Sequence, residues 1–529
     1  MPGTAPSARP SPAPAPLSHA PLVLVVTSAG LVFAGALAYF FSQDDFAALA
    51  RARGIIPPVP GVWRWVSGPV YFALMRPWGL AATAYHAVNL LAHCACAGLL
   101  FTLLRRRFAA PAAFLGALFF ATHPALYTAV YWVAALNEIL ALLFALLCIA
   151  WAARPGRAAW LAVPLFGLSL LSKETTLLLP AALWIAPGWL DPGHSPATPE
   201  DGGDRRRRDV RIALSVLALV YLALWLWSDA FGARSGLPAA APYAVGIGRH
   251  AVVNFITYLG WTAGTLLPVT RKFDDAAEPG LWPWAAALAA IWIAGLFSAR
   301  LRRSGWLAGG ATFVALIAPV LGLRNHTYHY YLYSPLIGVA WCAGALADAA
   351  FLAPAPARAG ATAGANAPRL RALAWPAALF AGALLLLNGA LMVRKIESMP
   401  FVNPRLRAEP VVDRALIARR VHDGLAAADL PPGARLLFWS PSSMIYERSL
   451  HPDADVIHAE TYWERNVRSA LMEGLAVRVM FPQVDSVTFL HAYTPAPADA
   501  RFVLYDPDGT VTVATPAHVD SMLRQATAR

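Results

Sequence analysis

The chain has 529 residues, of which 58% are hydrophobic and only 14% are charged. Its mean hydropathy of +0.51 excludes a soluble protein of this length, because long apolar stretches fill most of the sequence. The formal net charge of +12 does not indicate nucleic acid, since most arginines lie in short loops between apolar runs, as in membrane proteins. The composition therefore predicts an all-α polytopic membrane protein.

Apolar runs near the length of a membrane-spanning helix, about 20 residues, recur from residue 21 to residue 393. Two runs, 158–171 and 251–268, are short or interrupted, so we expect eleven or twelve transmembrane helices. Residues 1–20 are rich in Pro, Ala and Ser, and we expect them to be disordered and cytoplasmic. The runs lie at 21–41, 84–104, 109–127, 129–152, 158–171, 175–190, 211–229, 251–268, 281–298, 306–323, 331–353 and 372–393.

Clusters of arginine orient these helices, because the positive-inside rule places such clusters in cytoplasmic loops. The first loop, 42–83, and the tail after residue 393 then lie on the outer, non-cytoplasmic side of the membrane. An even number of crossings must separate the clusters near residues 205 and 300, so we interpret 251–268 as a re-entrant or interfacial segment. The clusters are Arg105 to Arg107, Arg154 with Arg157, Arg205 to Arg208, Arg300 with Arg302 and Arg303, and Arg358 with Arg369 and Arg371.

The tail, residues 394–529, has shorter apolar runs and more charged and turn-forming residues than the preceding part. Segments 435–439 and 501–505 are typical of short strands, and 409–428 and 462–474 are typical of amphipathic helices. We therefore expect a small C-terminal α/β domain on the outer face. Its scattered histidines lack the spacing of a metal site.

Polar side chains within the apolar part gather at the predicted outer helix ends. Such a mixture of acids and bases suits a transfer reaction with an anionic leaving group, in which a carboxylate accepts a proton while cations hold a phosphate. Asp44 and Asp45 could instead cap a helix end in water, and His93 could simply pack in the core. The residues are Asp44, Asp45, His86, His93, His123, Asn137, Glu138, Lys173, Glu174, Arg271, Lys272, Arg324, His326, His329 and Tyr330.

Several motifs, taken in order, resemble the GT-C glycosyltransferases. The most similar branch contains the protein O-mannosyltransferases, including those of the transmembrane-and-TPR type, and their bacterial relatives. The resemblance covers residues 25–190, with a weaker match to residue 340. The motifs are Asp44-Asp45-Phe46, Tyr85 to His93, Thr122-His123-Pro124, Trp132 with Asn137-Glu138, Leu171 to Thr175, and the tyrosine-rich stretch from Tyr328 to Gly338.

This resemblance implies an inverting transfer of a sugar from a polyprenyl-phosphate carrier to an acceptor hydroxyl. It implies that Asp44 is the catalytic base, with Asp45 as its partner or alternative, and that Lys173 and the outer arginines meet the donor phosphate. No cofactor is implied, although some distant GT-C enzymes use a divalent metal beside these acids. The residues implied in substrate binding are His86, Asn89, His93, His123, Glu138, Lys173, Glu174, Arg324, His329 and Tyr330.

The expected partners are the lipid-linked donor, membrane lipid and a protein or glycan acceptor, without nucleic acid. We expect a multi-pass protein of the inner (plasma) membrane with its active site on the periplasmic side. The chain departs from the family pattern at Thr128 and Leu136, where an acid and an arginine are usual, and no TPR repeats follow. A transporter or flippase, and a ligase or polymerase of surface glycans, are the alternatives.

Overall fold

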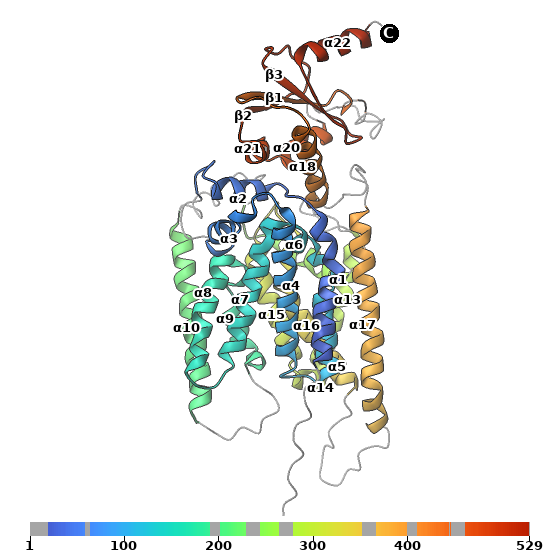
Figure 1. Cartoon of the computed structure of the whole chain (residues 1–529). Helices are drawn as coiled ribbons and strands as arrows, with labels where there is room; N and C mark the ends of the chain where they lie inside the picture. Colours follow the sequence, from blue (N-terminus) through green and yellow to red (C-terminus); the bar gives the residue numbers. More distant parts are fainter. Residues whose placement is uncertain are drawn as a thin grey trace, which may run out of the picture.

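The computed structural model describes residues 19–58, 64–190, 201–228, 244–263, 279–351, 367–398, 410–443, 445 and 461–527. Residues 1–18, expected to be disordered, lie outside these ranges, as do Arg271 and Lys272. A bundle of apolar helices forms one part of the molecule, and a small sheet domain stands on one end of it (Figure 1). The predicted class, a helical polytopic membrane protein with a C-terminal α/β domain, is confirmed.

Five stretches of helix are long and apolar enough to cross a membrane within the part of the chain that the structure describes. They are Ala20–Ala38, Ala82–Leu104, Val133–Ala152, Asp204–Trp227 and Leu373–Glu397. A bent pair, Ala110–Ala121 with Pro124–Tyr131, could form a sixth span, and the remaining apolar helices of the bundle are shorter.

Apolar side chains also stay exposed on the outside of the bundle. Leu219 and Leu387 are 65% and 55% exposed. Exposed apolar surface of this kind is typical of a face that contacts lipid.

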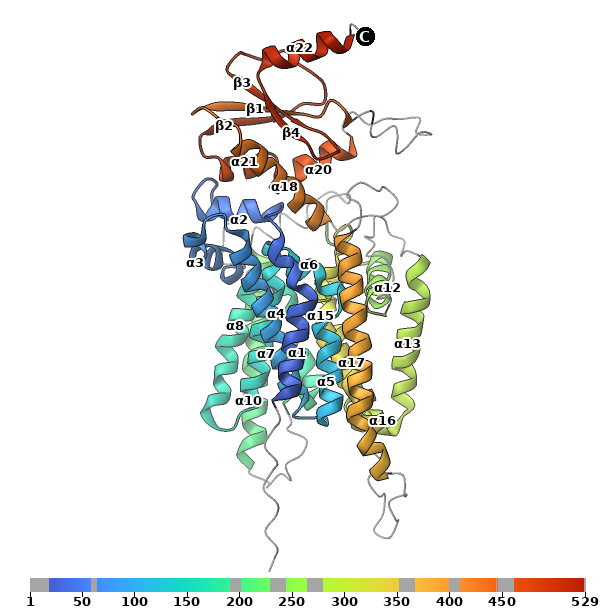
Figure 2. The same ribbon diagram turned by 45° about the vertical axis from the view of Figure 1, so that its right-hand side comes forward.

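The helices of the bundle lie along the predicted apolar runs, but the runs 109–127 and 129–152, each expected to be one helix, are broken at residues 122–126 and 132–135. The helices are α1 (Ala20–Phe33), α4 (Ala82–Leu104), α5 (Ala110–Ala121), α6 (Tyr127–Tyr131), α7 (Leu136–Ala152), α8 (Ala162–Ser172), α9 (Leu179–Ile185), α10 (Asp201–Trp227), α12 (Arg249–Ala263), α13 (Trp282–Phe297), α14 (Ala299–Arg303), α15 (Trp306–Leu321), α16 (Leu336–Phe351) and α17 (Ala367–Glu397). Helix α12 occupies only the half of the bundle nearer the C-terminal domain (Figure 2). This position agrees with a re-entrant or interfacial segment, although 264–268 lie outside the described residues.

The break between α5 and α6 brings the chain into position for the site. His123 precedes Pro124 and has an extended backbone, with φ −68° and ψ 121°, as residues before proline prefer. The helix therefore ends at Ala121 and restarts through the 3₁₀ turn η4 (Pro124–Leu126), with a bend of 44°. After α6 a second 3₁₀ turn, η5 (Val133–Ala135), leads into α7.

The first loop covers the end of the bundle below the C-terminal domain (Figure 1). Its helix α2 (Asp44–Ala52) follows the 3₁₀ turn η1 (Ala34–Ala38). The chain then passes through η2 (Val66–Val70), α3 (Tyr71–Leu74) and η3 (Arg76–Trp78) before entering α4. The arginine-rich α14 lies at the opposite end of the bundle (Figure 1).

The C-terminal domain contains a four-stranded sheet in the order β2-β1-β3-β4. The strands are β1 (Ala434–Trp439), β2 (Val484–Phe489), β3 (Ala500–Tyr505) and β4 (Val511–Ala514). Strand β1 runs parallel to both β2 and β3, while β4 is antiparallel to β3. Helices α18 (Pro410–Ala426), α20 (Tyr462–Ala470) and α21 (Leu475–Met480) lie on the bundle side, and α22 (Pro516–Thr527) lies beyond the sheet (Figure 1).

A glycine contact sets the distance between α15 and α16. A Cβ added at Gly309 would lie 2.5 Å from Cys342 Sγ and 2.6 Å from Gly338 O, whereas one added at Gly310 meets nothing within 4 Å. Gly309→Ala is expected to lower the free energy of unfolding by about 1–3 kcal/mol, because it forces the helices apart. Gly310→Ala is the matched control and should be neutral or stabilising. Thermal unfolding in detergent measures both, and equal melting temperatures would contradict this packing.

Candidate functional site

The two acids of the first loop begin the same helix but have different surroundings. Asp44 and Asp45 occupy the first turn of α2, where the helix dipole favours negative charge. The Asp45 side chain is fully buried, whereas Asp44 is exposed at the edge of a cavity.

Asp45 fastens the first loop to the segment that leads into α7. Its Oδ2 accepts a hydrogen bond from the Ser42 backbone N–H at 2.8 Å, and its Oδ1 accepts one from Ala134 N–H at 2.6 Å. Burial raises the pKa of Asp45 well above its ordinary value, and these two hydrogen bonds oppose that shift. Both carboxylate oxygens are therefore engaged with the backbone, and Asp45 is not among the residues that line the cavity.

The cavity has a volume of about 200 Å³ and lies between the first loop and the ends of the bundle helices nearest the C-terminal domain (Figure 1). Asp44 shares its wall with three cations, Arg51, Arg64 and Lys173. Its lining consists of Asp44, Ala47, Ala48, Arg51, Arg64, Ser67, Gly68, Phe72, Trp132, Ala134, Ala135, Asn137, Lys173, Tyr330 and Tyr331. Asp44 and Lys173, the base and one of the phosphate-binding cations implied by the resemblance, thus line one cavity.

Lys173 is held by an ion pair that is almost completely buried. Its Nζ lies 2.7 Å from Glu138 Oε1, with side chains that are 4% and 0% exposed. The Thr175 hydroxyl donates to Glu138 Oε2 at 2.9 Å, and Asn137 Oδ1 accepts from Lys173 Nζ at 3.4 Å. The basic neighbour of the buried Glu138 is therefore Lys173.

Aromatic rings cover the other side of the Lys173 ammonium. Its Nζ lies 4.8 Å from the ring centre of Tyr330 and 4.9 Å from that of Tyr331. The faces of aromatic rings attract a cation electrostatically, so these contacts help to hold the ammonium in place. The Tyr330 hydroxyl lies 3.0 Å from His326 Nε2, which fixes the ring of Tyr330 at the wall of the cavity.

Arg64 is fixed in the same way by Glu174. Its Nε and Nη2 donate to the two Glu174 carboxylate oxygens at 3.2 Å and 2.7 Å. Ser67, also in the first loop, donates from its hydroxyl to Ser172 O at 2.7 Å. These bonds tie the first loop to the turn between α8 and α9, so the predicted residue Glu174 acts on the cavity through Arg64.

Asn89 and His86 support the wall from α4. The Asn89 Nδ2 donates to the Trp132 carbonyl at 2.9 Å, and Trp132 lines the cavity. His86 is fully buried, with Nε2 3.4 Å from the Phe40 carbonyl. Neither Asn89 nor His86 is part of the cavity lining.

Three predicted residues lie elsewhere in the bundle and at its edge. His93 is fully buried between the Tyr333 hydroxyl, 2.8 Å from Nδ1, and Ala121 O, 3.1 Å from Nε2. His329 stacks on Trp261 with ring centres 3.9 Å apart. The Arg324 side chain is exposed, and its backbone N–H donates to Ala244 O at 2.9 Å. The structure does not bring His93, His329 or Arg324 into the Asp44 cavity.

His123 contributes to a second cavity of about 190 Å³. Its Nε2 lies 3.1 Å from Thr262 O, and its Nδ1 accepts from the Ala125 N–H at 3.2 Å. Most of the lining is apolar, contributed by α5, α12, α13, α16 and α17. The lining residues are Phe119, Thr122, His123, Pro124, Thr262, Ala263, Leu288, Val339, Leu385 and Asn388.

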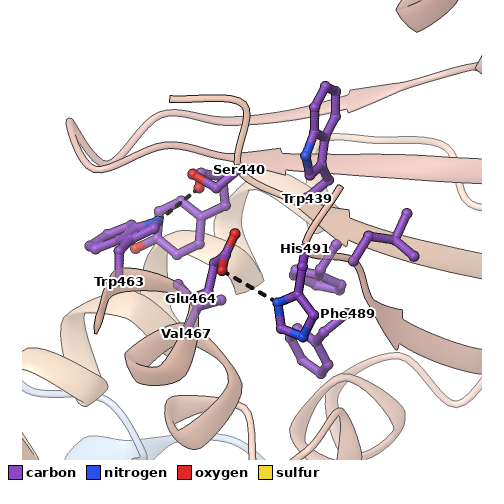
Figure 3. Close-up of a pocket in the computed structure, with 10 residues that line it drawn as sticks. Trp439, Ser440, Trp463, Glu464, Val467, Phe489 and His491 are labelled. Carbon is purple, nitrogen blue, oxygen red and sulfur yellow. Dashed lines mark hydrogen bonds and ion pairs between the residues drawn. The ribbon is translucent and has the colours of Figure 1, made fainter. Parts of the chain in front are cut away.

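A third pocket lies in the C-terminal domain, where β1, β2 and β3 end (Figure 3). Its carboxylate, Glu464, accepts from the Thr461 N–H at 2.9 Å and the Ser443 hydroxyl at 3.0 Å, and His491 Nδ1 lies 3.4 Å away. The volume of about 20 Å³ holds about one water molecule. The contacts of Glu464 thus hold α20 against the ends of the strands of the sheet.

Sequence reasoning missed two cations of the main cavity, Arg51 and Arg64. Arg51 follows Asp44 by seven residues in α2, which places both on one helix face, so this spacing could have revealed it. Arg64 has no such signal, because the path of the first loop depends on contacts with the rest of the bundle. In the described ranges no three His, Cys, Asp or Glu side chains form a metal-binding group, so the structure names no ligands for a divalent ion.

No family model and no curated protein sequence matches this chain. The crystal structure of ArnT from Cupriavidus metallidurans bound to undecaprenyl phosphate is 14% identical, with a TM-score of 0.43, covering 92% of this chain and 93% of that chain. The Archaeoglobus fulgidus oligosaccharyltransferase tethered to an acceptor peptide is 12% identical, with a TM-score of 0.42, covering 94% and 74%. Both TM-scores lie below 0.5.

Removing one partner of the buried pair should destabilise the protein strongly. Glu138→Ala leaves the Lys173 ammonium buried without its carboxylate, which typically costs about 3–5 kcal/mol. Glu174→Ala is the matched control, because its partner Arg64 is 34% exposed and loses less by facing water. Unfolding in detergent, followed by tryptophan fluorescence, should show the larger loss for Glu138→Ala. Equal losses would contradict the special role of the buried pair.

Proposed function

We propose that this chain is an inverting glycosyltransferase that moves a sugar from a polyprenyl-phosphate carrier to an acceptor hydroxyl at the outer membrane face. One observation carries the proposal: the Asp44 carboxylate shares a cavity with Arg51, Arg64 and Lys173 at the end of a bundle of apolar helices. The resemblance of the motifs around Asp44 and Lys173 to GT-C glycosyltransferases agrees with this arrangement.

The proposed reaction divides its charges between these groups. Asp44 accepts the proton of the acceptor hydroxyl, while the hydroxyl oxygen attacks the anomeric carbon of the donor from the face opposite the phosphate. A new C–O bond forms, the bond between the anomeric carbon and the phosphate oxygen breaks, and the configuration inverts. The lipid phosphate leaves with the bonding electron pair, and the cations stabilise its developing negative charge.

The cations are already oriented before any substrate binds. Lys173 is fixed by Glu138 and the two tyrosine rings, and Arg64 is fixed by its two hydrogen bonds to Glu174. Groups held in this way need little reorganisation as charge develops, which is how preorganised sites lower a barrier. Arg51 adds a third positive charge from the same helix as Asp44.

The surroundings of Asp44 suit a base. Although Asp44 faces the cavity, the surrounding protein displaces part of the water near its carboxylate and so raises the pKa of Asp44 above the ordinary value, while the charges of Arg51, Arg64 and Arg414 oppose the rise. A base with a raised pKa accepts a proton more readily, provided that it is still ionised at the working pH. Asp45, engaged by two backbone donors, fixes the start of the helix that carries this base.

The substrates of the proposed reaction reach the cavity by two routes. The lipid-linked donor diffuses within the inner (plasma) membrane to the bundle, and the protein or glycan hydroxyl that acts as acceptor enters from the periplasmic side. The polar groups gather at one end of the bundle, and a carrier that moves its substrate across the membrane would need them near the midplane.

The decisive experiment incubates purified protein with a panel of polyprenyl-phosphate sugars and with peptide or glycan acceptors. No transfer from any donor would overturn the proposal.

Asp44→Asn is expected to lower the turnover of a lipid-linked sugar by ~10²–10⁴-fold while the melting temperature stays unchanged. The amide has nearly the shape of the carboxylate, but it cannot accept the proton of the acceptor hydroxyl. Turnover at matched expression measures the effect.

Asp45→Asn is the matched control for this prediction. Its amide group would face one of two backbone N–H donors, so it should lower thermal stability as well as activity. Full activity of Asp44→Asn, together with a stable but inactive Asp45→Asn, would exchange the roles of the two acids. Full activity of the double variant would rule out this mechanism.

A further inference from the structure

The C-terminal domain touches the first loop at the residue that precedes the proposed base. Arg414 on α18 donates from Nη1 to Gln43 Oε1 at 2.6 Å, across 371 positions of sequence. A second link joins the far end of α2 to the same domain, because Arg53 donates from Nη1 to Val479 O at 2.6 Å. Both ends of the short helix that carries Asp44 are thus held by the C-terminal domain (Figure 2).

Gln43 has a backbone conformation that needs such support. Its φ of 50° and ψ of −118° lie in a region that side-chain-bearing residues rarely adopt, at a cost of about 1–3 kcal/mol. This conformation turns the chain sharply from Ser42 into α2 and so sets the direction of Asp44. The hydrogen bond from Arg414 holds the Gln43 side chain, and a strained residue persists only where its surroundings hold it.

Arg414 also adds a charge to the surroundings of the base. The charged and titratable groups around Asp44 come from several elements: Arg51 and Asp45 on α2, Arg64 in the first loop, Lys173 and Tyr330 on the cavity wall, and Arg414 on α18. Of these, Arg51, Arg64 and Arg414 lower the pKa of Asp44 against the effect of burial. Only Arg414 belongs to the C-terminal domain.

We propose that the C-terminal domain positions the catalytic base, with Arg414 as the positioning residue that acts on Asp44 through Gln43. This inference rests on the proposed function for its catalytic meaning, but the contact itself can be tested separately. The role of the domain is then to hold α2 over the cavity. The small pocket within the domain itself suggests no such role. Arg414 does not line the cavity and so is not placed in contact with substrate.

The experiment compares Arg414→Met, Arg414→Lys and Gln43→Ala in the full-length protein, with Arg419→Met as the matched control. Arg419 is an exposed arginine of the same helix, which pairs with Asp423 and lies over Phe40 rather than against Gln43. Amide hydrogen exchange of α2 and the pH profile of sugar transfer are both measured. Gln43→Ala removes the contact without altering the C-terminal domain, so it covers the case in which Arg414→Met fails to fold.

Exchange of the first-turn amides of α2 is expected to be faster in Arg414→Met and Gln43→Ala and unchanged in Arg419→Met. Turnover should fall about tenfold in both contact variants, with the donor KM nearly unchanged, because misplaced catalytic groups lose rate rather than binding. The double variant should lose little more than either single variant, since both remove one contact.

The pH profile separates the charge of Arg414 from its contact. Removing a cation that lowers the pKa of Asp44 raises that pKa, so Arg414→Met should lose activity at a higher pH as the solution becomes acidic. Arg414→Lys keeps the charge and should keep the wild-type acidic limb. Unchanged exchange and unchanged turnover in both contact variants would overturn the inference. Failure of the proposed function would give a different result, because the wild-type protein would then transfer no sugar. Amide hydrogen exchange of α2 would still decide whether Arg414 positions this helix.

Discussion

The cost of burying charge in an apolar bundle governs the site. Glu138 and Lys173 lie where neither is stable alone, so each requires the other, and the pair fixes the turn after α8 against the start of α7. That constraint presents the Lys173 ammonium at the cavity wall, under the rings of Tyr330 and Tyr331. The other contacts of the cavity assemble around this fixed cation.

The first loop depends on the same principle of satisfied polar groups. Asp45 uses both oxygens to bind backbone N–H groups, and Arg64 is paired with Glu174, so the loop is attached to the bundle at two places. Asp44, next to Asp45 in sequence, is left facing the cavity. Two adjacent carboxylates thus divide into one that builds the site and one that is available for chemistry.

The sequence predicted part of this site for identifiable reasons. Charged residues within or directly beside apolar runs are costly, so Asp44, Glu138 and Lys173 could be recognised as a group from their positions in the chain. Their motifs and the tyrosine-rich stretch also predicted Tyr330. The same reasoning selected His93 and His329, which the structure places in packed positions, because a buried histidine and a substrate-binding histidine give the same pattern in sequence.

The sequence by itself determined where the apolar helices lie, and it located two strands and two helices of the tail, because hydropathy acts locally along the chain. It did not reveal the break at His123-Pro124, since the apolar run 109–127 continues through it. Only the tertiary structure decided which acid faces the cavity, that Arg64 reaches it, and that Arg414 meets Gln43. These contacts join residues that are far apart in sequence, through the path of an irregular loop and the seating of a separate domain. Such long-range contacts follow from tertiary packing, and local hydropathy and turn patterns in the sequence do not predict them.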